Sequence, residues 1–150
     1  MTNLSVTHVA GDRFEVQVRG HRLVVDQPVD DGGEDQGPTP TELFVASLAA
    51  CVAFYAGRFL SRHGLTTEGL AVRCASTMST GRLARVESIT LEVVTGQPLA
   101  DNRRKALLAV VDHCTVHNSI RNPPEVRIAL VEADRTEDPL SGKADARAAL

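Results

Sequence analysis

The sequence predicts an α+β fold, and three observations lead to that prediction. Short segments near the N-terminus and in the middle of the chain alternate apolar and polar residues, which is the period of a half-buried strand. A long apolar segment over residues 39–64 begins and ends with residues typical of helix caps. The elements are expected in the order β-β-β-α-β-β-α-β, which indicates an α+β protein whose long helix packs on sheet.

An N-terminal antiparallel meander of three strands is expected before the long helix. Residues 4–9 and 14–19 alternate around a turn at residues 10–13, and residues 22–26 supply the third strand. Residues 30–38, DDGGEDQGP, form an acidic, Gly-rich loop that we expect to hold no regular structure.

The long helix has clear start and stop signals. Thr39 fits the N-cap position, Pro40 fits the first helical position, and Glu42 follows the cap by three residues as in a capping box. Gly64 fits the position just after the helix. Apolar side chains leave no polar stripe between these ends. The helix is therefore expected to be buried under other structure rather than to span a membrane.

The rest of the chain is expected to form a second hairpin, a second helix, a short turn and a final strand. These elements are predicted over residues 70–77 with 86–95, 99–113, 114–120 and 126–132, respectively. Together the predicted elements make one domain over residues 1–133. A polar tail over residues 134–150 is expected to be loose.

Composition narrows the class of protein. The chain has 150 residues, a net charge of -3 and scattered basic residues, so nucleic-acid binding is not expected. No N-terminal stretch combines a charged start with an apolar run, so no signal peptide is expected. Three cysteines, an odd number without paired spacing, argue against a secreted disulfide framework and favour a reducing cytoplasm.

The cysteines are the candidate chemical groups. Cys51 lies near the middle of the long helix, where a free thiol is either core filler or a protected nucleophile. Cys114 ends the apolar face of the second helix and so carries another thiol toward the core. Two thiols in one core allow a cycle in which one attacks and the other resolves the oxidised form. Cys74, within a strand, is predicted to be a packing residue. Arg58, on almost the same helix face as Cys51, is a candidate thiolate partner or an arginine that reaches solvent.

Metal binding is a rival interpretation of the same region. His113, Cys114 and His117 are potential ligands, but zinc needs further donors, and no second pair with ligand spacing is present. We therefore expect no metal.

Two segments resemble the OsmC/Ohr family (osmotically inducible protein C-like) of thiol-dependent peroxidases. They are PTPTELFVASLAAC, which ends at Cys51, and HCTVHNSI, which contains Cys114. The order of the surrounding elements is also similar, over residues 4–132. The resemblance implies an intertwined homodimer that reduces organic hydroperoxides or hydrogen peroxide without a cofactor.

The resemblance also implies roles for individual residues. Cys51 would be the peroxidatic thiolate that becomes a sulfenic acid, and Cys114 the resolving thiol that closes a disulfide. A small dithiol such as dihydrolipoamide would return the protein to the reduced state.

In the family an arginine on the N-terminal strands steadies the thiolate, and a glutamate near the start of the long helix orients that arginine. Arg13 is the closest match for the arginine, with Arg19 and Arg22 as alternatives. The glutamate of the organic-peroxide branch falls at Thr41 here, one residue before Glu42. Glu42 is a candidate catalytic residue by its pattern in other branches, and a capping residue by its position.

Two further functions remain open at this stage. A dimeric small-molecule binding or redox-sensing protein would keep the fold and the thiols but have little peroxidase turnover. A metal-binding module is the third class.

Overall fold

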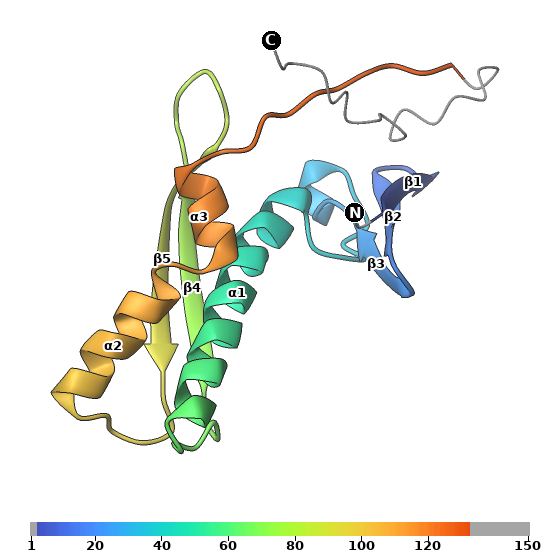
Figure 1. Cartoon of the computed structure of the whole chain (residues 1–150). Coiled ribbons are helices and arrows are strands. Elements are labelled where there is room, and N and C mark those ends of the chain that lie inside the picture. The colour runs from blue at the N-terminus through green and yellow to red at the C-terminus, as the bar shows by residue number, and fades with distance from the viewer. Residues whose placement is uncertain (1–2, 133–150) are drawn as a thin grey trace, which may run out of the picture.

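The described part of the chain contains a three-stranded sheet and a larger body of two strands and three helices, and an irregular loop joins them (Figure 1). The computed structural model describes residues 3–132, so the tail predicted over residues 134–150 lies outside the described part. The mixture of antiparallel strands and helices confirms the predicted α+β class.

The N-terminal sheet is the predicted meander. It contains β1 (Leu4–Ala10), β2 (Arg13–Val18) and β3 (His21–Val25), which pair antiparallel in the order β1-β2-β3. Gly11 has a φ of +53° in the turn between β1 and β2, a backbone conformation that glycine adopts without a steric penalty.

Residues 27–38, which we call the acidic loop, lead from β3 to the long helix. We expected no regular structure here, but one 3₁₀ turn, η1 (Val29–Asp31), forms near its start. Hydrogen bonds hold its two ends together: the Asp26 N–H donates to the Pro38 carbonyl (3.4 Å), and the Asp35 N–H donates to the Gln27 carbonyl (3.0 Å).

The long helix α1 (Pro40–Arg62) starts and stops as predicted. The Glu42 N–H donates to Thr39 Oγ1 (3.1 Å) while the Thr39 N–H donates to Glu42 Oε2 (2.8 Å), which completes a capping box. Gly64 has a φ of +65° just beyond the helix, and the Leu65 N–H donates to the Leu60 carbonyl at 3.0 Å.

The second body is built around α1. The hairpin of β4 (Ala71–Met78) and β5 (Val86–Val94) packs against it, as do α2 (Asp101–Val111) and α3 (Thr115–Arg121). Where the sequence predicted only a turn after Cys114, α3 forms a helix of 7 residues. The core contains Leu48, Val52, Ala56, Phe59, Leu60, Leu107, Val111 and Cys114.

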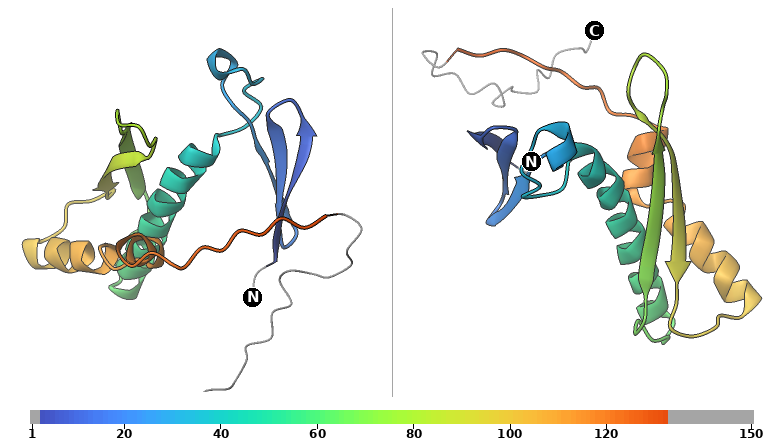
Figure 2. Two further views of the ribbon diagram at one scale, coloured as in Figure 1. Left: turned by 90° about the horizontal axis from the view of Figure 1, so that it is seen from above. Right: turned by 180° about the vertical axis from the view of Figure 1, so that it is seen from behind.

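The expectation that α1 is buried on all sides is wrong for the single chain. Among residues 3–132, nothing gives comparable cover to the side of α1 that faces away from β4, β5, α2 and α3, and Phe54 on that side is 56% exposed. Figure 2 shows the N-terminal sheet standing apart from α1 in both views. By length and composition α1 could cross a membrane, but core helices of soluble proteins meet the same criterion.

The predicted final strand is also wrong for the single chain. Residues 126–132 form no strand and leave α3 as an extended segment that runs away from the second body (Figure 1). Ile128 and Leu130 are each 95% exposed. The alternation of this segment is that of a strand, but a strand needs a partner to satisfy its backbone groups, and within residues 3–132 it has none.

Candidate thiol site

Cys51 and Cys114 meet in the core of the second body. Cys51 comes from the middle of α1 and packs against the core cluster that includes Cys114, the N-cap residue of α3. The two thiols are close enough for Cys51 to raise the pKa of Cys114. Cys51 is half-buried at the edge of the core cluster, whereas Cys114 is 0% exposed. Of these two thiols, Cys51 is therefore the one open to a reagent from solvent.

The surroundings of Cys114 favour its protonated form. Burial raises the pKa of the Cys114 thiol, because a charged thiolate is poorly solvated in the core, and the contact with Cys51 raises this pKa further. The backbone N–H groups of His117 and Val116 act in the opposite sense, but burial dominates. The Cys114 thiol is therefore harder to ionise than an ordinary thiol.

Tyr55 is a site residue that the sequence reasoning missed. Its hydroxyl lies 3.1 Å from Thr115 Oγ1 and so ties α1 to the first residue of α3. Tyr55 follows Cys51 by one helical turn, and Thr115 follows Cys114 directly. The two residues joined by this hydrogen bond are therefore sequence neighbours of the two cysteines. The spacing of four residues from Cys51 was the available signal.

A second tie holds α3 against the end of α2. Arg121 donates from Nη1 and Nη2 to the two carboxylate oxygens of Asp112, at 3.1 and 3.0 Å. These hydrogen bonds lower the pKa of Asp112, and His117 Nδ1 lies 3.6 Å from the same carboxylate. The turn that carries Cys114 is therefore fixed on both sides.

The predicted thiolate arginine lies elsewhere in the single chain. Arg13, at the start of β2, pairs with Glu34 of the acidic loop (Nη1 to Oε2, 2.9 Å). No extensive contact joins the N-terminal sheet to α1 within residues 3–132. The single chain therefore does not bring Arg13 to its own Cys51.

Two of the other candidate arginines, Arg22 and Arg58, are engaged with other groups. Arg22 lies 3.6 Å from Glu15 on the N-terminal sheet. Arg58 lies over the ring of Phe54, 5.4 Å from its centroid, on the exposed side of α1.

The remaining candidates have clear positions. The Glu42 carboxylate forms the helix cap described above. Cys74 was predicted to be a packing residue, but this prediction is wrong in the single chain because Cys74 is exposed on β4. Val72, two residues earlier on β4, lies on the same face of the strand as Cys74 and packs against the core cluster. The core therefore covers this face of β4 at Val72 but not at Cys74.

The potential metal ligands do not converge. His113, just beyond the end of α2, has its Nδ1 2.9 Å from the carbonyl of Ala109 in that helix. In the part of the chain that the structure describes, no group of three His, Cys, Asp or Glu side chains could hold a metal ion.

The fold and the paired thiols point to a thiol-bearing α+β protein, and sequence comparison gives the family. The profile of the OsmC-like protein family matches residues 33–129, so the chain belongs to this family. A search of curated proteins gave no match.

Solved structures share the fold. A candidate osmotic stress induced and detoxification response protein of Psychrobacter arcticus has a TM-score of 0.73 and 24% identity, over 79% of this chain and 88% of that one. An organic hydroperoxide resistance protein OsmC of Legionella pneumophila has a TM-score of 0.62 and 21% identity, over 81% and 89%. The organic hydroperoxide resistance protein OhrB of Bacillus subtilis has a TM-score of 0.60 and 14% identity, over 82% and 92%.

Proposed function

We propose that this protein is a cytoplasmic, thiol-dependent peroxidase that reduces organic hydroperoxides or hydrogen peroxide. One observation carries the proposal: half-buried Cys51 packs against the core cluster that contains fully buried Cys114. A first thiol that solvent reaches, backed by a second thiol that solvent does not reach, is the arrangement that a peroxide-reducing dithiol needs. Membership of the OsmC-like family and the names of two structural neighbours support the same activity.

The first step oxidises Cys51. Its thiolate attacks the terminal oxygen of the peroxide, an S–O bond forms, and the O–O bond breaks. The departing alkoxide takes up a proton and leaves as the alcohol, or as water when the substrate is hydrogen peroxide. Cys51 becomes a sulfenic acid, so its sulfur has lost the two electrons that the peroxide gained.

The second step resolves the sulfenic acid. The sulfur of Cys114 attacks the sulfur of Cys51, an S–S bond forms, and the S–O bond breaks. The hydroxide leaves as water with the proton that Cys114 has held. A small dithiol, for example dihydrolipoamide, then reduces the disulfide by two electrons, supplies two protons and itself becomes a cyclic disulfide.

We further propose that the active form is an intertwined homodimer in which Arg13 of one subunit steadies the Cys51 thiolate of the other. The exposed apolar side chains support a dimer, because extensive apolar surface usually marks an interface. They lie on α1, on the N-terminal sheet and on the extended segment after α3, as Phe44, Phe54, Leu4, Val6, Ile128 and Leu130. Within one chain the N-terminal sheet, which carries Arg13, makes no extensive contact with α1, which carries Cys51. This separation supports an arginine that comes from the partner subunit.

Hydroperoxide consumption with dihydrolipoamide as reductant tests the activity. We expect Cys51→Ser to abolish turnover, and Cys114→Ser to stop after one oxidation of Cys51. Cys74→Ser is the matched control and should keep wild-type turnover, because the Cys74 side chain is exposed and does not belong to the core cluster. Full activity of Cys51→Ser would reject the peroxidase.

The mass of the oxidised wild-type protein, read together with its turnover, distinguishes a peroxidase from a redox-sensing protein. A Cys51–Cys114 disulfide with sustained turnover supports the peroxidase. The same disulfide without turnover supports a redox-sensing protein.

A further inference from the structure

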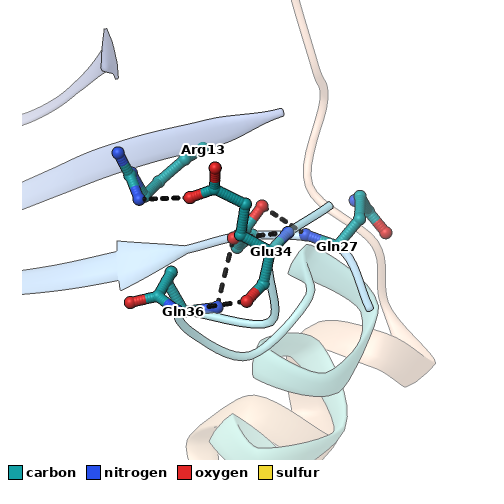
Figure 3. Close-up of polar contacts among 5 residues, drawn as sticks. Arg13, Gln27, Glu34 and Gln36 are labelled. Atoms are coloured by element: carbon teal, nitrogen blue, oxygen red, sulfur yellow. Dashed lines mark hydrogen bonds and ion pairs between the residues drawn. The ribbon is translucent and has the colours of Figure 1, made fainter. Parts of the chain in front are cut away.

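Arg13 has a carboxylate partner that the family resemblance does not predict. Figure 3 shows its guanidinium directed at Glu34, with an Nη1 to Oε2 distance of 2.9 Å. No other hydrogen bond of this guanidinium occurs among residues 3–132, so further N–H groups remain to bind an anion. The Arg13 side chain is 28% exposed and that of Glu34 is 73% exposed. An ion pair this open contributes little to stability, so its significance is geometric.

Asp26 fixes the backbone that carries Glu34. Its carboxylate is 1% exposed and accepts hydrogen bonds from the N–H groups of Gln27 (2.8 Å), Glu34 (3.2 Å) and Gln36 (3.1 Å). These N–H groups, together with the nearby positive charge of Arg13, lower the pKa of Asp26. Arg13 thus pairs with the surface carboxylate of Glu34, and its charge also acts on the buried carboxylate of Asp26.

The acidic loop is also pressed tightly onto the end of β3. A Cβ atom at Gly33 would overlap the carbonyl of Gln27, and one at Gly37 would overlap the carbonyl of Val24. Asp35, between them, has a φ of +54°, a left-handed conformation that few residues other than glycine, Asn and Asp adopt readily. These constraints fix the backbone of the acidic loop on both sides of Glu34.

Glu42 caps the long helix and does not pair with Arg13. One of its carboxylate oxygens accepts the Thr39 N–H at the start of α1, and no ion pair joins Glu42 to an arginine among residues 3–132.

We propose that Glu34, presented by Asp26 and the acidic loop, is the positioning residue for Arg13, in place of the glutamate at the start of the long helix. The inference rests on the proposed function, in which Arg13 steadies the Cys51 thiolate. Glu34 does not touch the reacting atoms. It fixes the direction of the guanidinium, which saves the arginine from having to be ordered at each turnover.

The direction in which the pH dependence of Cys51 alkylation shifts shows whether Glu34 acts by positioning Arg13 or only through its negative charge. Loss of a negative charge near a thiolate, taken alone, makes the thiolate easier to form and moves thiol alkylation to lower pH. Loss of the group that holds Arg13 weakens the interaction between Arg13 and the Cys51 thiolate, which makes the thiolate harder to form and moves alkylation to higher pH. The two effects of removing Glu34 are opposite in direction.

The experiment compares Glu34→Gln with Glu42→Gln, which removes the same charge eight residues further on. Peroxide turnover is measured for both full-length variants. The rate of iodoacetamide alkylation at Cys51 is followed by peptide mass as a function of pH. For Glu34→Gln we expect a turnover loss of about tenfold or more, because misplacing a group by about 1 Å can cost about a hundredfold, and alkylation that moves to higher pH. Glu42→Gln should keep both properties near wild type.

A double variant closes the test. Arg13→Ala should lose turnover, and adding Glu34→Gln to it should cause little further loss, because the two residues act as one unit. Wild-type behaviour of Glu34→Gln, alkylation that moves to lower pH, or a loss found only in Glu42→Gln would overturn the inference. An inactive wild type would reject the proposed peroxidase, whereas the alkylation comparison would still decide whether Glu34 acts on Cys51.

Discussion

The buried carboxylate of Asp26 sets the pH range in which the acidic loop keeps its shape. It accepts three backbone hydrogen bonds in the folded protein, whereas in the unfolded chain it is an ordinary solvated carboxyl group. Hydrogen bonds to the charged form lower its folded pKa below the usual value of 3.8. The charged form therefore stabilises the fold above that value, and this stabilisation is lost as the pH falls through the folded pKa.

Asp26→Asn should remove this dependence. We expect the variant to melt at a lower temperature than wild type at pH 7, and the difference to narrow as the pH falls below about 4, because the wild-type carboxyl group is then protonated as well. Circular dichroism melts at several pH values measure this difference. Asp30→Asn, in the exposed part of the same loop, is the control and should follow wild type. A constant gap between Asp26→Asn and wild type at all pH values would contradict the assignment.

Residues of the candidate site were predictable to different degrees. The sequence separation of Cys51 and Cys114 says nothing about contact, so their pairing came from the family resemblance and not from residue patterns. Both thiols lie at one core cluster, and their disulfide stays a prediction. Glu34 could not be predicted, because its approach to Arg13 depends on how the acidic loop folds back against β3.

At the scale of elements, the first turn of α1 shows how a local sequence signal fixes a boundary. Thr39 and Glu42 satisfy each other's backbone N–H groups, which would otherwise lack partners at the start of a helix. This boundary matters for the site because α1 holds Cys51.

Thr39→Ala should lower the free energy of unfolding by about 1 kcal/mol, the usual cost of removing an N-cap side chain. Urea unfolding followed by far-ultraviolet circular dichroism measures the change. Thr41→Ala is a matched control inside the first turn, and it should change stability much less because no cap depends on it. If Thr39→Ala unfolds like wild type, the capping box does not contribute to the stability of α1.

The elements that the sequence predicted well are those with signals inside their own residues. The alternation of β1 to β5 and the caps of α1 need no knowledge of distant neighbours. The segment at residues 126–132 has the same alternation, yet it forms no strand in one chain, because strand formation also needs a partner edge. The full burial expected for α1 is not reached in one chain for the same kind of reason, because burial also depends on a partner surface outside the helix itself.

At the scale of the whole molecule, these two failures have one explanation if two chains assemble. An extended segment without a partner and a long apolar helix covered on one side are both incomplete as parts of a monomer. A second copy would supply cover for α1 and a partner for the segment after α3. It would also supply the arginine that one chain holds away from its own thiols.

A mixed dimer tests this arrangement directly. We expect Cys51→Ser and Arg13→Ala each to be inactive, or nearly so, as pure dimers. Co-expression with two different affinity tags allows the mixed dimer to be purified, and its native mass verifies that it contains two chains. In that dimer one site combines an intact Cys51 with an intact Arg13 from the other subunit, so turnover should recover to about half of wild type when the sites act independently. If Arg13 served the thiol of its own chain, both sites would lack one group, and the mixed dimer would stay as inactive as its parents. A wild-type protein with the mass of one chain would reject the dimer itself.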